Sequence, residues 1–278
     1  MPHVIILGAG HNGLVASILL ARAGLTVTVV EERSQVGGAC KTEYPFASAP
    51  KLGCSTGAYL LGLMPPELMS QLGLELPLLR RDPHYFLPTT GKRFLLVGSD
   101  ARELRRQFAE FFSDEDWSAH LAMNAELAAI RDDLAPAWLQ PPLTLEETAE
   151  RFIRRPLREA FTQLCRGSAR EYLERFGFRS DLVKAMYAVT DAFSGLDGAY
   201  DTPGTGMNLL VHNMCRLPKS DGTWMVVQGG MGTVTRRLAE LARAAGASIR
   251  LGEAVTAIEV EGNAANAVQL ASGERLRA

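Results

Sequence analysis

Short apolar runs on either side of a helical segment open the chain. Residues 3 to 7 are almost wholly apolar and predict a buried parallel strand. Residues 12 to 23 predict a helix that ends at Gly24, and the valine-rich residues 25 to 31 predict a second strand. A strand, helix and strand in so short a span predict parallel strands joined by a right-handed crossover.

The middle of the chain has helical periodicity, preceded by a loop-rich region from about Ser48 to Ser99. In that region residues 92 to 97 predict one arm of a hairpin. Ser113 is followed by three acidic residues and predicts a helix start, and Thr144 to Glu147 predicts a capping box. Further helices are predicted over residues 156–166 and 181–193.

Beyond Asp221 the pattern returns to glycine turns and short strands. The glycines of residues 229 to 232 predict a turn into a helix over residues 233–245. Strands are predicted over residues 248–251, 254–260 and 267–270, with a turn at residues 261–263, as at the start of a β-meander. We therefore expect three segments: a dinucleotide-binding part over residues 1–55, an inserted lobe over residues 56–215, and a return to the first domain over residues 216–278.

The composition narrows the function classes. A hydrophobic fraction of 47%, a charged fraction of 22% and a formal net charge of −2 are typical of a globular protein without a polyanionic partner, so we expect no nucleic-acid binding. No run approaches the about 18 apolar residues that span a bilayer, and the apolar opening lacks the basic start of a signal peptide, so we expect a cytoplasmic protein. The four cysteines form no pair or metal-ligand pattern, which argues for buried free thiols, no metal site and no disulfide-exchange chemistry.

Gly8, Gly10 and Gly13 form the pattern G-x-G-x-x-G between the first strand and the first helix. The first glycine permits a tight turn, the second lets a pyrophosphate approach the backbone, and the third lets the helix pack closely on the strand. Glu31 ends the second strand, where an acid accepts hydrogen bonds from an adenosine ribose. Glu32 is an alternative, but Glu31 continues the alternation of the strand. An acid here also disfavours a bound 2′-phosphate.

The residues after the acid separate FAD from NAD. Glu31 to Gly38 reads EERSQVGG and resembles the extended fingerprint of the glutathione-reductase-like FAD enzymes, especially amine oxidases and phytoene desaturases. That resemblance implies FAD as cofactor, an arginine at Arg33 against it, and a pair of glycines, Gly37 and Gly38, near the pyrophosphate or flavin. A simple NAD-binding unit does not need this second glycine pair, although glycine pairs also occur in ordinary turns.

Within these enzymes, the turn GAGHNGL resembles the phytoene-dehydrogenase-related branch, which includes proteins with a pyridine nucleotide-disulfide oxidoreductase domain. The resemblance implies that His11 and Asn12 lie at the cofactor together with the turn glycines, and that the backbone of Val255 pairs with adenine. From the residues alone, Val255 is also explained as a core residue of a strand. Members of this branch continue beyond the point where this sequence ends, so we expect a chain truncated at its C-terminal side.

The expected fold is therefore α/β: a glutathione-reductase-like FAD-binding Rossmann domain with a β-meander and an inserted, mostly helical substrate lobe, incomplete at its end. The resemblance implies an FAD-dependent oxidoreductase that removes a hydride from a small or apolar organic molecule at flavin N5. A non-catalytic nucleotide-binding remnant and an NAD-dependent enzyme are the alternatives. A homo-oligomer or a second chain could complete the fold.

No residue is assigned a catalytic role from the sequence. His11 and His212 are candidates, but a lone histidine is more often a hydrogen-bonded structural group. Trp224 and Met231 could line a cavity, although core packing explains both.

Overall fold

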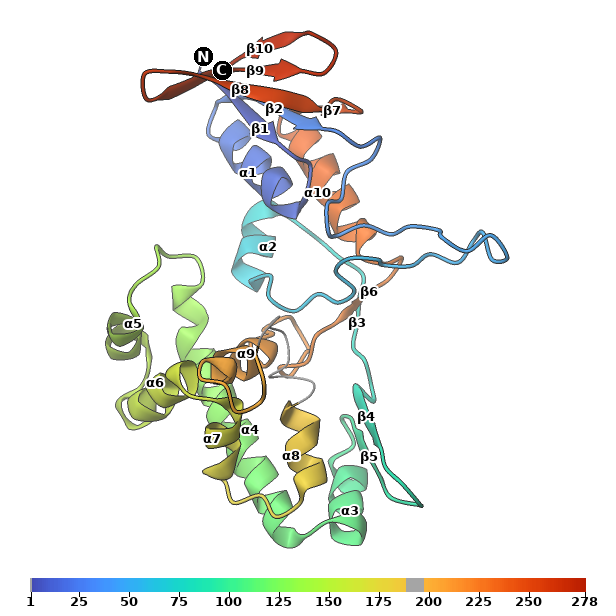
Figure 1. Ribbon diagram of the computed structural model, residues 1–278, viewed down its shortest axis with the longest axis vertical. Coiled ribbons are helices and arrows are strands. Elements are labelled where there is room, and N and C mark those ends of the chain that lie inside the picture. The colour runs from blue at the N-terminus through green and yellow to red at the C-terminus, as the bar shows by residue number, and fades with distance from the viewer. Residues whose placement is uncertain (1, 189–197) are drawn as a thin grey trace. The chain divides into compact units, whose positions relative to one another are not determined.

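A computed structural model describes residues 2–188 and 198–278 of the chain (Figure 1). These residues form two compact units, each discontinuous in sequence. Unit 1 comprises Met1–Leu61, Glu67–Leu79 and Val226–Ala278, and unit 2 comprises Gly62–Pro66 and Arg80–Met225. The units are divided in sequence at 61/62, 66/67, 79/80 and 225/226, where the sequence predicts boundaries at 55/56 and 215/216 and does not predict the return of residues 67–79 to unit 1.

A parallel sheet of three strands is the centre of unit 1. β1 (His3–Leu7), β2 (Thr26–Glu31) and β7 (Ser248–Leu251) lie side by side in the order β1-β2-β7 (Figure 1). Val4 pairs with Val27, and Val29 pairs with Ile249. The crossover from β1 to β2 is α1 (His11–Arg22), which packs against α10 (Gly232–Ala244), the helix that precedes β7. The strand–helix–strand prediction is confirmed.

A second sheet of unit 1 is antiparallel. β8 (Val255–Glu261), β9 (Ala264–Leu270) and β10 (Arg275–Arg277) form a meander in the order β10-β9-β8. Val268 and Leu270 of β9 pack on Val30 of β2, so the inner face of the meander contributes to the core of the parallel sheet. The predicted turn at residues 261–263 is present, but β9 begins at Ala264, three residues before the predicted start.

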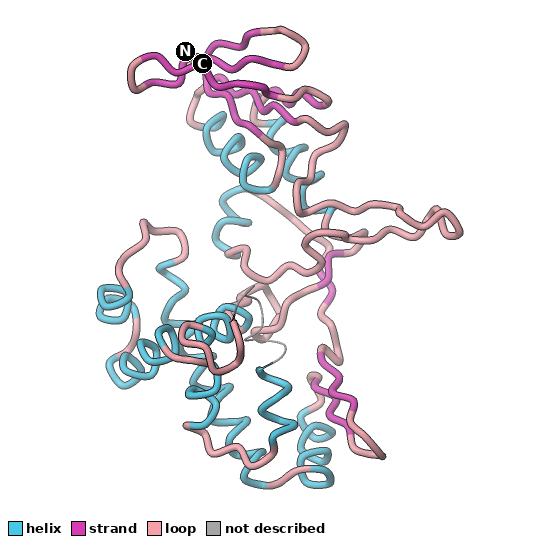
Figure 2. Tube along the Cα trace, in the orientation of Figure 1, coloured by secondary structure: helices cyan, strands magenta, loops and turns pink. Residues whose placement is uncertain are grey.

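Unit 2 is mostly helical, as Figure 2 shows in cyan. The helices among its described residues are α3 (Ala101–Phe111), α4 (Asp114–Leu134), α5 (Leu145–Phe152), α6 (Arg158–Arg166), α7 (Ala169–Glu174), α8 (Asp181–Tyr187) and α9 (Thr205–His212), and these residues also form 3-10 turns at Ala135–Ala137 and Arg155–Leu157. A hairpin of β4 (Tyr85–Pro88) and β5 (Phe94–Val97) packs on α3. Phe108, Met123, Ile130 and Leu173 are among the side chains of its core.

Local signals placed several of these helices correctly. Ser113 accepts a hydrogen bond from the backbone of Asp116 at the start of α4, and Thr144 and Glu147 form the predicted capping box of α5. The predicted hairpin arm is β5. The helix predicted from residue 181 is present to Tyr187, and its predicted end at residue 193 lies outside the described residues.

Four helices were not identified from the sequence: α2 (Pro66–Leu72), α3, α7 and α9. α2 is only seven residues long and lies in the Pro- and Gly-rich region. It is attached to unit 1 through Arg22 of α1, whose guanidinium donates to the carbonyl oxygens of Gln71 and Leu72 at 2.7 and 2.9 Å. The short strands β3 (Leu78–Leu79) and β6 (Val226–Val227) pair with each other where one segment of unit 1 ends and the next begins. Such long-range contacts leave no periodic signal in the sequence.

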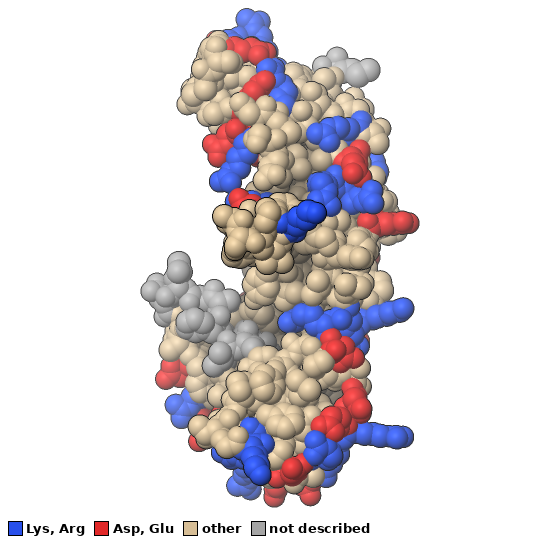
Figure 3. All heavy atoms as spheres, turned by 90° about the vertical axis from the view of Figure 1, so that its right-hand side faces the viewer, with Lys and Arg blue, Asp and Glu red and all other residues tan. Residues whose placement is uncertain are grey.

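Charged side chains of both signs are interspersed over the face shown in Figure 3, in agreement with the formal net charge of −2. Many charged side chains of the described residues form ion pairs at the surface, such as Arg275 with Glu259 and Arg237 with Glu240. No helix among residues 2–188 and 198–278 is long and apolar enough to cross a membrane.

Candidate functional site: the glycine turn of unit 1

The first glycine turn joins β1 to α1 with little space for side chains. Gly8 has φ +96°, and its N–H donates to the carbonyl of Val30 at 2.7 Å, which ties the turn to the end of β2. A Cβ on Gly13 would lie 2.2 Å from the carbonyl oxygen of Gly8 and 3.2 Å from Cγ2 of Ile6. Gly13 is therefore the glycine that allows the helix to lie directly on the strand, as the sequence predicts.

The second glycine pair folds back onto this turn. Gly37 donates its N–H to the carbonyl of Ala9 at 3.0 Å, and Gly10 and Gly37 form a parallel bridge. A Cβ on Gly38 would lie 3.2 Å from Cα of Gly10, and Gly38 has φ +56°. Two turns separated by more than twenty residues thus form one surface of bare backbone, which only glycine permits.

The N-terminal end of α1 has free backbone donors. Its N-cap is Gly10, which offers no side-chain cap. The N–H groups of His11, Asn12 and Gly13 have no acceptor among the described residues. Elsewhere hydroxyls serve this purpose, as Thr144 does for α5. Free N–H groups and the positive end of the helix dipole together favour an anion such as phosphate.

Glu31 faces this turn from the end of β2. Its side chain is almost completely buried, at 8% exposure. Oε2 accepts the N–H of Ala9 at 2.8 Å, and Oε1 accepts the N–H of Arg33 at 3.0 Å. Each carboxylate oxygen has a second lone pair, so the carboxylate can accept ribose hydroxyls and keep both backbone bonds. Glu32 and Arg33 are exposed. The geometry therefore favours Glu31 over Glu32, as the strand alternation predicts.

His11 begins α1 and is exposed, and Cys40 lies beside it. Nδ1 of His11 is 3.6 Å from Sγ of Cys40, within reach of a weak hydrogen bond of sulfur. Cys40 is buried, and burial raises the pKa of its thiol. Asn12 is also exposed. The residues predicted from the turn and from the second glycine pair are thus brought together within unit 1.

Val255 lies on the returning strand β8, next to the backbone of the same region. The N–H of Glu253 donates to the carbonyl of Glu31 at 2.9 Å, and the N–H of Gly252 donates to that of Arg33 at 2.8 Å. The Val255 side chain is half-buried and packs with the core cluster around Val30. The structure thus shows its packing role, and its contact with adenine stays a prediction.

Comparison with known proteins identifies the family. Residues 13–278 match the model of the family described as flavin containing amine oxidoreductase. The chain belongs to this family. This family is flavin-containing. The bare backbone at Gly10 and Gly38, the free N–H groups of α1 and the buried carboxylate of Glu31 fit the ADP half of FAD.

Named relatives support the same assignment. This member of the amine oxidoreductase family is 33% identical, over 305 residues, to a rat protein called pyridine nucleotide-disulfide oxidoreductase domain-containing protein 2, covering 98% of the chain and 51% of the relative. It is 28% identical to hydroxyneurosporene desaturase of Cereibacter sphaeroides over 301 residues, covering 100% of the chain and 55% of the relative. The chain spans about half the length of these curated relatives.

Solved structures show the same fold at lower identity. A structure of putrescine oxidase matches with a TM-score of 0.58 and 21% identity, covering 100% of the chain and 57% of that protein. An oxidoreductase from Methanosarcina mazei matches with a TM-score of 0.60 and 18% identity, covering 100% of the chain and 57% of that protein. The α/β fold expected from the sequence is therefore that of FAD-dependent amine oxidases.

Two hydroxyl groups in unit 1 were not identified from the sequence. Thr42 accepts the N–H of Gly232 at 3.0 Å, and Ser55 accepts the N–H of Met231 at 3.0 Å, so both cap the N-terminal end of α10. A Cβ on Gly230 would lie 2.4 Å from the Thr42 hydroxyl. Each partner is about 180 residues away in sequence, at separations of 190 and 176, and no local pattern could have paired them.

The remaining candidates have structural surroundings. In unit 2, Nδ1 of His212 donates to the carbonyl of Asn208 at 2.9 Å, and its ring stacks on Trp224 with centroids 5.3 Å apart. Met231 is buried, as core packing predicts. All four cysteines are free, and Cys40 and Cys215 are the buried ones. Among the described residues, no group of three or more side chains could hold a metal ion.

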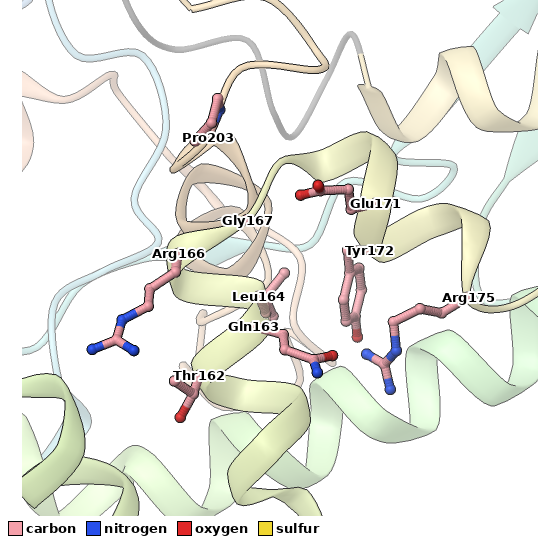
Figure 4. Close-up of a pocket in the computed structure, with 9 residues that line it drawn as sticks. All are labelled: Thr162, Gln163, Leu164, Arg166, Gly167, Glu171, Tyr172, Arg175 and Pro203. Atoms are coloured by element: carbon pink, nitrogen blue, oxygen red, sulfur yellow. The ribbon is translucent and has the colours of Figure 1, made fainter.

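A cavity of about 630 Å³ lies in unit 2 beside α6 and α7 (Figure 4). Its charged side chains have partners within the unit: Arg166 pairs with Glu146, and Arg175 pairs with Glu126 at 3.1 Å. The cavity is lined by Thr162, Gln163, Leu164, Arg166, Gly167, Glu171, Tyr172, Arg175 and Pro203. The third charged side chain of the lining, Glu171, accepts hydrogen bonds from the backbone N–H and the hydroxyl of Ser168 at 2.8 and 3.1 Å, so all three already have partners and the cavity does not define the chemistry of a ligand.

Proposed function

We propose that this chain binds FAD through the glycine turn of unit 1 and contributes to an oxidoreductase that oxidises a small or apolar organic molecule. The observation that carries the proposal is the meeting of Gly10, Gly38 and Glu31 at an uncapped helix N-terminus. Membership of a flavin-containing family supports FAD as the nucleotide in this proposal.

Each part of this site has a distinct task in the proposal. The free N–H groups of His11, Asn12 and Gly13 bind the pyrophosphate, where the helix dipole adds positive charge. Gly10 and Gly38 let the phosphates approach the backbone without meeting a Cβ. Glu31 accepts the ribose hydroxyls and fixes the adenosine end. Bound FAD supplies the hydride acceptor, and the protein supplies binding, orientation and exclusion of water.

The substrate is proposed at the level of class. Relatives include proteins named hydroxyneurosporene desaturase and phytoene desaturase, and a structural neighbour is putrescine oxidase. Loss of hydride from a C–H bond is common to desaturation and amine oxidation. We therefore propose only that the substrate is an organic molecule with such a C–H bond, which is consistent with the names of these relatives and of the structural neighbour.

The proposal is tested by expressing the chain with FAD and recording an absorption spectrum after gel filtration. A yellow protein with the flavin band at about 450 nm, released on denaturation, is the expected result. The comparison is Glu31→Gln, which weakens the ribose acceptor and should give a protein with much less bound flavin, against the exposed Glu32→Gln as matched control; a melting curve of each variant shows whether the fold is kept.

Colourless wild-type protein that binds ADP but not FAD would contradict flavin binding. It would favour an NAD-dependent enzyme or a non-catalytic nucleotide-binding protein. The elution volume in the same experiment tests whether the chain associates with itself.

A further inference from the structure

His11 is an ionisable side chain at the first residue of α1, and the backbone of its neighbour Cys40 is fixed by the fold. The N–H of Cys40 donates to the carbonyl of Gly37 at 2.9 Å, and its own carbonyl accepts the hydroxyl of Thr235 at 2.8 Å. The backbone of Cys40 is therefore held in place on both sides. Its Sγ lies 3.6 Å from Nδ1 of His11.

The contact with the thiol bears on which nitrogen of the imidazole carries the proton. Cys40 is 7% exposed, and burial raises the pKa of its thiol, so the thiol stays protonated at neutral pH. If it donates its S–H to Nδ1, the ring hydrogen of a neutral imidazole is on Nε2. Nε2 has no hydrogen-bond acceptor among the described residues. In that tautomer an exposed side chain at the first residue of α1 carries an N–H donor, at the helix end where the free backbone donors are.

We propose that His11 donates its Nε2–H to the pyrophosphate of the bound dinucleotide, and that Cys40 acts as a positioning residue that holds the imidazole in the required tautomer. This inference rests on the proposed function. The side chain adds one charge-assisted hydrogen bond to those of the backbone amides. It also makes the site selective for a pyrophosphate over the uncharged adenosine alone.

The test compares His11→Leu, which removes the donor, with His11→Gln, which keeps an N–H of similar reach. Affinity is measured for FAD by quenching of flavin fluorescence, and for ADP and adenosine by calorimetry. His11→Leu should weaken FAD and ADP by about tenfold or more and leave adenosine unchanged, because a hydrogen bond to a charged group is lost. His11→Gln should recover most of the affinity. All variants should have the wild-type melting temperature, since His11 is exposed.

The role of Cys40 has its own readout. Nitrogen NMR shifts of the His11 ring should report an unprotonated Nδ1 in the wild type and in Cys40→Ser, and a mixture of tautomers in Cys40→Ala. FAD affinity should fall in Cys40→Ala and recover in Cys40→Ser. A wild-type ring with its proton on Nδ1 would overturn the positioning role.

Failure of the inference and failure of the proposed function give different results. Wild-type protein that binds neither FAD nor ADP overturns both. Wild-type protein that binds both ligands, with His11→Leu binding them equally well, overturns only the role of His11. Equal losses for ADP and adenosine, with a lowered melting temperature, would show that His11 is structural and also overturn its role.

Discussion

Two glycines of the same turn are predicted to respond differently to one added methyl group. Gly13→Ala places a Cβ 2.2 Å from the carbonyl oxygen of Gly8, a backbone atom that is held by the bond from Gly8 N–H to Val30. Gly10→Ala places its Cβ 3.9 Å from Cα of Gly38, an ordinary contact, and Gly10 has φ −76°, which alanine adopts freely. The first change should disturb the fold, and the second should disturb only the approach of a ligand.

The magnitudes follow from this geometry. An overlap of about 1 Å with fixed backbone costs about 3 kcal/mol, at the upper end of the usual range for overpacking. For a protein of this size each kcal/mol lowers the melting temperature by about 2–4 °C, so Gly13→Ala should lose about 6–12 °C. Gly10→Ala should keep the wild-type melting temperature or gain slightly from the lower entropy of its unfolded chain.

The assay pairs thermal denaturation without cofactor with a fluorescence titration of FAD. Gly10→Ala should bind FAD at least about tenfold more weakly than wild type at unchanged stability, because its methyl group occupies the path of the pyrophosphate. A Gly13→Ala protein as stable as wild type would refute the packing argument. A Gly10→Ala protein with full FAD affinity would refute the assignment of the phosphate position.

Three further predictions concern named side chains. Glu31→Gln should lower the free energy of unfolding by about 1–3 kcal/mol in chemical denaturation, because the amide cannot accept from both backbone N–H groups; the exposed Glu32→Gln should have no effect, and equal losses would contradict this account. Thr144→Ala should cost about 1 kcal/mol through loss of the capping box, and unchanged stability would show that the cap is not needed. Burial lowers the pKa of His120 to about 4, so its contribution to stability is complete above about pH 6.5 and is lost as the pH falls toward 4. His120→Gln should flatten this part of the pH profile, and an unchanged profile would exclude His120 as its source.

The elements around the candidate site were predictable because their signals are local. The valines of β2 and the glycines of the first turn lie within thirty residues of one another, and each residue type has a backbone reason for its position. Thr144 and Glu147, three residues apart, likewise predict the start of α5. The resemblance of residues 31 to 38 to FAD enzymes added the second glycine pair, which composition alone could not distinguish from a surface turn.

The contacts that complete the site were not predictable, because they join segments far apart in sequence. The hydroxyls of Thr42 and Ser55 cap a helix that begins at Gly232. The thiol of Cys40 was expected to be only a buried hydrophobe, yet it lies against the ring of His11. The local sequence around each of these residues does not predict which distant residue it contacts.

The sequence by itself determined the unit of strand, glycine turn, helix and acid-ended strand, since backbone conformation and hydrophobic periodicity act over a few residues. Only the tertiary structure decided that the second glycine pair lies on Gly10, that the Glu31 carboxylate accepts the N–H of Ala9, and that residues 67–79 belong to unit 1. These outcomes depend on which apolar surfaces pack against one another and on which hydrogen-bond donors and acceptors from distant segments meet. That choice is made by the whole chain and not by any short segment of it.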